Sequence, residues 1–123
     1  MKYLCLGYYD EKKFDAMPKA ERDALIEKCR THDEALHQSG HLILVASLAA
    51  PDVSRCVRPR SGAVLVTDGP YAEAKEAVGA FFLIEAKDFD EAVQVASKHP
   101  AAHLGENVGW GIEVRPIDYF VQL

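Results

Sequence analysis

Three ionisable side chains, those of Arg22, His32 and Asp33, fall on the apolar stripe of a helix predicted over residues 18–39. At 100° per residue, His32 lies about 20° from the apolar Leu25, and Arg22 and Asp33 lie on the other side of the stripe. The apolar members of the stripe are Leu25, Cys29 and Leu36, with Ile26 on the flank. An isolated charge there would lose its hydration at a cost of several kcal/mol. The inner face of this helix therefore looks into a polar cavity or pairs with groups in a sheet.

His32 is the side chain best suited to acid–base catalysis, because an unperturbed imidazole titrates near neutral pH. A carboxylate would have to orient the ring, and the candidates are Asp33 and Asp68. His32 and Asp33 are adjacent, so their side chains point about 100° apart on a helix, which keeps Asp68 as the alternative partner. The competing interpretation of His32 is a core histidine whose polar atoms are satisfied and which takes part in no chemistry.

Residues 66–76 read VTDGPYAEAKE, and Asp68, Gly69 and Pro70 within them are predicted to form a turn. Asp68 can accept a hydrogen bond from the backbone two residues on, Gly69 permits positive φ, and Pro70 fixes φ for the start of a helix. A second role is compatible with the first: the turn would place Asp68 and Tyr71 at the mouth of a pocket.

Glu73, Lys75 and Glu76 are expected on one short helical turn after this motif. The simplest interpretation is a solvated, charged face with weak pairing between neighbours. The alternative is that one of the three turns inward as an acid, a base or a ligand for an anion. The sequence leaves open which carboxylate faces a cavity: Asp33, Asp68 or Glu73.

The elements that must position these side chains alternate within a single domain, residues 1–123. Strands are predicted at 2–9, 41–50, 79–86 and 110–115, and a hairpin at 54–58 and 63–67. A second helix is predicted from Asp88, where a capping box with Glu91 marks its start, to Pro100. The charged run 10–13 is expected to end the first strand. This order predicts an α+β fold of the ferredoxin-like βαββαβ kind with an extra hairpin, both helices lying on one face of a mainly antiparallel sheet. The other face would be apolar and is expected to be covered by a second copy of the chain.

The net charge of −5 argues against a nucleic-acid partner, because binding to phosphates needs a basic surface. The one basic cluster is the short run Arg55, Arg58 and Arg60. No apolar run approaches the roughly 20 residues that span a bilayer, so no membrane partner is expected.

Cofactor and metal sites are not predicted either. Cys5, Cys29 and Cys56 have unrelated spacings and read as reduced thiols, which makes the cytoplasm the expected location. The histidines match no zinc or 2-His-1-carboxylate pattern. No glycine-rich phosphate loop, GxSxG motif or catalytic Cys–His spacing occurs.

With these pieces in place, the chain resembles the YCII-related superfamily, and within it the group named for its DGPF motif. The matching residues are 1–4 (MKYL), 66–73 (VTDGPYAE) with Lys75 and Glu76, 79–82 (GAFF) and 113–116 (EVRP). The phenylalanine of the motif is Tyr71 here, which adds a hydroxyl group. The resemblance implies a ferredoxin-like subunit that forms a dimeric α+β barrel. It also implies a pocket between the first helix and the sheet with a His–Asp pair as its reactive centre.

Two functional hypotheses follow. In the first, the protein is a lyase or isomerase that moves a proton on a small, cyclic or aromatic organic molecule: His32 is the acid or base, Asp68 or Asp33 orients it, and Tyr71, Arg22 or Glu73 contacts the substrate. In the second, the protein is a non-catalytic homodimeric module that binds a small ligand or a protein, and the association of the family with extracytoplasmic-function sigma factors points the same way. A purely structural role of the polar cluster is the third interpretation.

Overall fold

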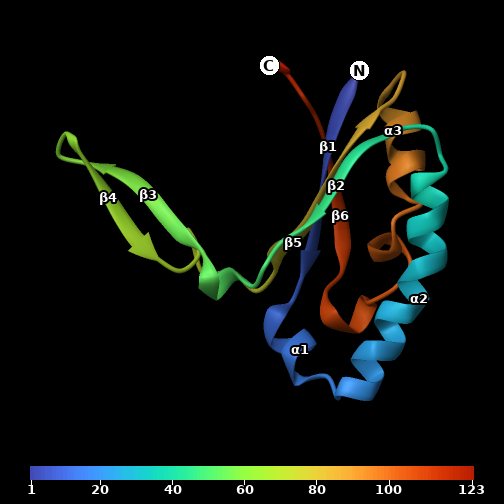
Figure 1. Ribbon diagram of the computed structural model, residues 1–123, viewed down its shortest axis with the longest axis horizontal. Coiled ribbons are helices and arrows are strands. Elements are labelled where there is room, and N and C mark those ends of the chain that lie inside the picture. Colours follow the sequence, from blue (N-terminus) through green and yellow to red (C-terminus); the bar gives the residue numbers. More distant parts are fainter.

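The structure is a computed structural model that describes residues 1–123, and its centre is a four-stranded sheet (Figure 1). The strand order is β2–β5–β1–β6, and all neighbours are antiparallel. The strands are β1 (Lys2–Tyr9), β2 (Leu42–Ser47), β5 (Ala77–Glu85) and β6 (Gly111–Pro116). The α+β class and the antiparallel sheet are therefore confirmed, and the strand order is compatible with a ferredoxin-like fold.

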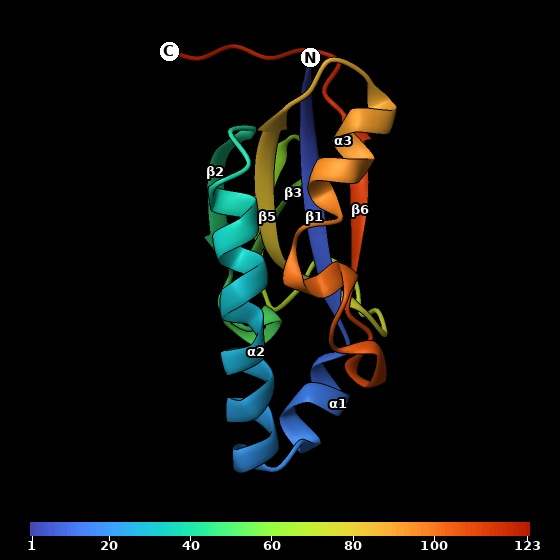
Figure 2. The same cartoon turned by 90° about the vertical axis from the view of Figure 1, so that its right-hand side faces the viewer.

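The helices are α1 (Glu11–Ala16), α2 (Lys19–His37) and α3 (Phe89–Ala96); short 3₁₀ turns stand at Pro51–Val53, Pro100–Ala102 and Glu106–Val108. The two longer helices, α2 and α3, lie on one face of the sheet, and α1 lies beyond the end of the sheet at which β1 ends (Figures 1 and 2). Alternation along the strands sends every second side chain toward the helices, among them the fully buried Tyr3, Cys5, Phe82 and Ile84. Leu36 of α2 and Ala92 and Val95 of α3 close the core from above.

Helix α1 was not predicted from the sequence. The charged run 10–13 does end β1, but it also begins this helix, because Asp10 is an N-cap whose Oδ1 accepts a hydrogen bond from the Lys13 amide at 3.1 Å. Glu11 follows in the first turn, where a negative charge is favourable. The Asp10 amide donates to the Val108 carbonyl at 2.8 Å and ties α1 to the loop before β6.

The expected helical turn at Glu73, Lys75 and Glu76 does not exist: residues 69–76 form an irregular loop. Pro70 suits the start of a helix, but starting a helix is costly, and this segment has no apolar stripe that packing could reward. The turn itself is confirmed, since Gly69 has φ +94° directly after β4.

The predicted hairpin is present and longer than expected, with β3 at Arg55–Arg60 and β4 at Ala63–Asp68. It forms a two-stranded sheet of its own and projects from the body on the side opposite the helices (Figure 1). We call residues 55–68 the arm.

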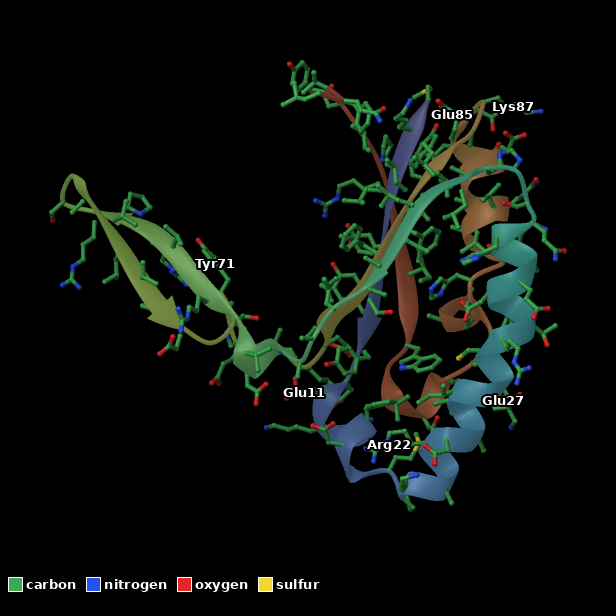
Figure 3. All side chains as sticks on the ribbon, in the orientation of Figure 1. Glu11, Arg22, Glu27, Tyr71, Glu85 and Lys87 are labelled. Carbon is green, nitrogen blue, oxygen red and sulfur yellow. The ribbon has the colours of Figure 1, made fainter.

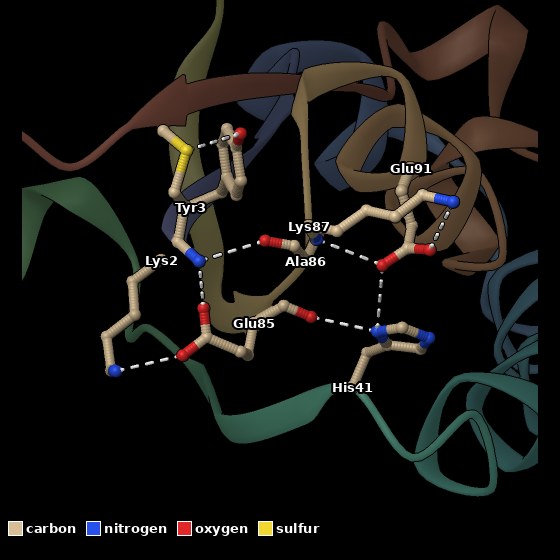
Figure 4. Close-up of polar contacts among 8 residues, drawn as sticks. Lys2, Tyr3, His41, Glu85, Ala86, Lys87 and Glu91 are labelled. Carbon is tan, nitrogen blue, oxygen red and sulfur yellow. Dashed lines mark hydrogen bonds and ion pairs between the residues drawn. The ribbon is translucent and has the colours of Figure 1, made fainter.

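A polar cluster fastens the end of the sheet at which β1 begins (Figure 4). The Glu85 carboxylate contacts the Met1 amino group at 2.5 Å and Lys2 Nζ at 3.1 Å, and these two groups lower the pKa of Glu85. His41 Nδ1 donates to the Glu85 carbonyl oxygen at 2.8 Å. The polar groups of this cluster bind one another. We therefore look for a functional site at the other end of the sheet.

Candidate functional site

A cavity of about 350 Å³ lies between α2, the end of β1, and the loop that leads into β6. Its walls include Tyr9, Phe14 and Trp110, and its polar lining includes Cys29, Asp33, Ser47 and His99. The expectation of a pocket between the first long helix and the sheet therefore has a counterpart in the structure. Of the residues predicted to be catalytic, Asp33 lines it, whereas the histidine in it is His99.

His99 is held by two contacts. Its ring stacks on the fully buried Phe82, with centroids 4.9 Å apart and an interplanar angle of 4°. Its Nδ1 accepts a hydrogen bond from the Ala101 amide at 3.0 Å, because His99 caps the 3₁₀ turn at Pro100. An Nδ1 that accepts a hydrogen bond carries no proton, so the neutral ring carries its proton on Nε2.

Burial lowers the pKa of His99 below its ordinary value of 6.5, and the negative charge of Asp33 partly offsets this. His99 is therefore neutral at pH 7 and offers an Nε2–H donor. The Asp33 carboxylate has no ion-pair or hydrogen-bond partner in the chain. The cavity thus combines an unpartnered carboxylate with a neutral imidazole donor.

Glycines let two aromatic walls approach the backbone. A Cβ on Gly79 would lie 2.8 Å from the Tyr9 ring, so the tyrosine packs against β5 only where that strand has no side chain. Gly105 has φ +74°, and a Cβ there would overlap the Trp110 indole. Both glycines serve to place rings at the edge of the cavity.

His32 does not line the cavity. It is half-buried, and its ring stacks on His103 with centroids 4.8 Å apart. Asp68, the predicted partner of His32, is the last residue of β4, at the base of the arm. Its side chain is 91% exposed and pairs with Arg55 at 3.5 Å. The structure does not bring His32 and Asp68 together.

The predicted substrate contacts are also distributed. Arg22 is half-buried and lies over the Phe14 ring at 5.7 Å, near the cavity but outside its lining (Figure 3). Tyr71 and Glu73 line a second, open hollow of about 950 Å³ between α1 and the 70–78 segment. Tyr71 is held there by Arg58, whose guanidinium lies 4.0 Å from the ring centroid.

Cys29 is a poor nucleophile in spite of its place in the cavity. Burial and the neighbouring Asp33 raise the pKa of its thiol, which donates to the Leu25 carbonyl at 3.3 Å. No three His, Cys, Asp or Glu side chains lie close enough together to hold a metal ion.

Sequence reasoning missed His99 because its position depends on a connection. Helix α3 has eight residues and so spans roughly 12 Å, less than the length of the sheet. The segment 97–110 must cover the remaining distance before β6 can begin opposite Tyr8. That path carries His99 across the inner face beside α2. The prediction extended the second helix to Pro100, whereas α3 ends at Ala96, so His99 belongs to the connection and not to the helix.

Comparison with known proteins agrees with the resemblance noted above. The YCII-related domain family matches residues 1–117. A protein of Rhizobium meliloti (strain 1021), described as uncharacterized, is 31% identical over 117 residues, which are 95% of this chain and 92% of the relative. The chain therefore belongs to the YCII-related domain family.

No helix has both the length and the apolar composition needed to cross a membrane.

Proposed function

We propose that the protein binds a small organic carbonyl compound in the cavity between α2 and the sheet and catalyses a proton transfer on it, as a lyase or isomerase does. The observation that carries this proposal is that the exposed Asp33 carboxylate and the neutral His99 donor line one aromatic-walled cavity, close enough for the Asp33 charge to act on His99.

The two side chains divide the work. Asp33 is the base that removes a proton next to the carbonyl carbon, because its carboxylate has no partner inside the chain. His99 donates from Nε2–H to the carbonyl oxygen and stabilises the negative charge that develops there. Because Nδ1 accepts from Ala101, His99 is a donor and not the base. This reverses the roles that the sequence suggested for a His–Asp pair.

The walls determine the class of ligand. Tyr9, Phe14 and Trp110 surround the polar pair with apolar rings, which favours a cyclic or aromatic molecule. The volume of about 350 Å³ lies at the small end of ligand cavities.

The test combines a thermal-shift screen of small cyclic and aromatic ketones with deuterium exchange of their α-protons, followed by NMR. Wild type is expected to be stabilised by a ligand and to accelerate its exchange. Asp33→Asn should abolish exchange while retaining binding, and His99→Gln should slow exchange by about 10²-fold or more.

His37→Gln on the exposed end of α2 is the matched histidine control. His32→Gln separates the two candidate histidines: loss of exchange in this variant, with His99→Gln unaffected, would return the reactive role to His32. Stabilisation without any exchange would instead support the second hypothesis, a module that binds its ligand without chemistry.

We also propose that the protein is a homodimer. The sheet face turned away from the helices, called the open face, carries an apolar group on neighbouring strands: Leu4, Leu6, Leu44, Phe81 and Leu83. No helix covers this face (Figure 2). A second copy packed face to face would cover it, which is the arrangement of a dimeric α+β barrel.

We further propose that the chain belongs to the DGPF-motif group of the family and that it is a cytoplasmic protein. Residues 66–76 favour the DGPF-motif group within the family. The three free thiols favour a reducing compartment, the cytoplasm.

A further inference from the structure

The arm has two unlike faces. The register pairs Val57 with Val66 and Pro59 with Val64, so these four side chains share one face. Cys56, Arg58 and Leu65 belong to the other face, over which Tyr71 lies. The chain itself therefore covers part of this face, and the opposite face is a continuous apolar strip.

The apolar strip has no partner within the chain. Val57, Val64 and Val66 are 67%, 70% and 57% exposed. An isolated two-stranded hairpin is at best marginally stable in water, and an exposed apolar strip makes it less so. The arm therefore needs a partner that packs against this strip and stabilises it.

Charge distinguishes the arm from the body. The arm holds Arg55, Arg58 and Arg60 against Asp68, a net of 3 − 1 = +2. The whole chain carries −5, so the remaining residues carry −5 − 2 = −7. A basic, apolar arm is complementary to the acidic body of another copy of the same chain.

The position and length of the arm also favour a second copy of the chain as its partner. The arm leaves the body on the side of the open face, away from α2 and α3 (Figure 1). A strand of six residues spans roughly 20 Å, whereas two sheets packed face to face lie about 10 Å apart. In a face-to-face dimer, an arm of this length would reach past the partner's sheet to its flank.

We infer that the arm clasps a second copy of the chain, packing the strip of Val57, Pro59, Val64 and Val66 on the partner's flank. This inference rests on the homodimer proposed above and adds a second contact region to it. Because the dimer is two-fold symmetric, each copy grips the other with the same residues.

Sedimentation equilibrium over a range of concentrations measures the dimer dissociation constant of wild type, Val64→Asp and Ala63→Asp. Both substitutions add the same charge to neighbouring exposed positions, but Ala63 pairs with Arg60 on the face opposite the strip. Val64→Asp is expected to weaken the dimer at least about tenfold, and Ala63→Asp at most about threefold.

Leu6→Lys separates the two contact regions, since it disrupts the open face and leaves the arm intact. If Val64→Asp dimerises like wild type while Leu6→Lys is monomeric, the arm inference is overturned and the open-face dimer stands. A wild-type monomer at roughly 100 μM overturns both. Hydrogen exchange gives an independent readout: arm amides protected equally in monomeric Leu6→Lys and in wild type would mean that the chain covers its own arm, against the inference.

Discussion

The reactive character of the candidate site depends on which nitrogen of His99 holds the proton. The Ala101 amide takes the Nδ1 lone pair, and Phe82 supports one face of the ring, so Nε2–H is the group left for a ligand. Asp33, on the neighbouring helix, supplies the charge that acts on it. In the proposed reaction, these surroundings assign the two residues different roles.

The pKa of His99 tests this environment directly. We expect NMR titration to place it below 6.5, and Asp33→Asn to lower it further, because the Asp33 charge raises it. His37→Gln should leave the titration of His99 unchanged. A His99 pKa that rose in Asp33→Asn would contradict the proximity of the two groups.

The same shift makes stability depend on pH. With the folded pKa of His99 below 6.5, the unfolded chain binds more protons below that pH. The contribution of His99 is fully present above pH 6.5 and is lost as the pH falls through the folded pKa. Urea unfolding of wild type and His99→Gln between pH 7 and 5 should show a smaller loss of stability in the variant; equal losses would contradict the shift.

At the scale of elements, the site depends on segments with little regular structure. The loop 97–110 brings both His99 and Trp110 to the cavity, and α1 brings Phe14. The sheet and α2 form a rigid support on which these pieces meet. Local conformations at Gly105 and Asp10 therefore decide the shape of the site.

Gly105→Ala should destabilise the protein by about 1–3 kcal/mol and displace Trp110. The residue would need φ +74°, and its methyl group would overlap the indole. Chemical unfolding measures the first effect, and the fluorescence of Trp110, the single tryptophan, reports the second. Gly111→Ala is the control, since its Cβ would meet no atom within 4 Å.

Asp10→Ala should reduce the free energy of unfolding by about 1 kcal/mol through loss of the α1 cap. Asp10→Asn keeps an oxygen that can accept from the Lys13 amide, so it should restore most of this stability. Equal losses in the two variants would show that the charge of Asp10, and not its capping bond, stabilises α1.

At the scale of the whole molecule, α2 and α3 cover one face of the sheet and the arm stands on the other side (Figures 1 and 2). A chain organised in this way has a single complete core and an apolar open face. Its stability should therefore depend on association with a second copy.

The thermal midpoint of wild type should rise with protein concentration, because only the folded chain dimerises. Leu6→Lys should have a midpoint that is lower and independent of concentration. Differential scanning calorimetry between about 5 and 500 μM measures both. A wild-type midpoint that did not change over this range would contradict the homodimer.

The sequence by itself determined the class of fold, because strand alternation, the long helix before Gly40 and the capping box at Asp88 are local signals. The box is present in the structure: the Asp88 side chain accepts from the Glu91 amide. It also predicted ionisable residues on the inner face of α2, since a helical repeat fixes which positions share a face. Arg22 and His32 are half-buried, whereas Asp33 is exposed and borders the cavity. It did not reveal α1, where one capping residue outweighed a run of charges.

Only the tertiary structure decided which of those residues meet. Asp33 faces the cavity while its neighbour His32 stacks on His103, and Asp68 lies out on the arm with Arg55. His99 enters the site because a short α3 forces the following loop across the sheet. Helical and strand periodicity act over a few residues, whereas the partner of a catalytic group is set by how distant segments are connected and packed.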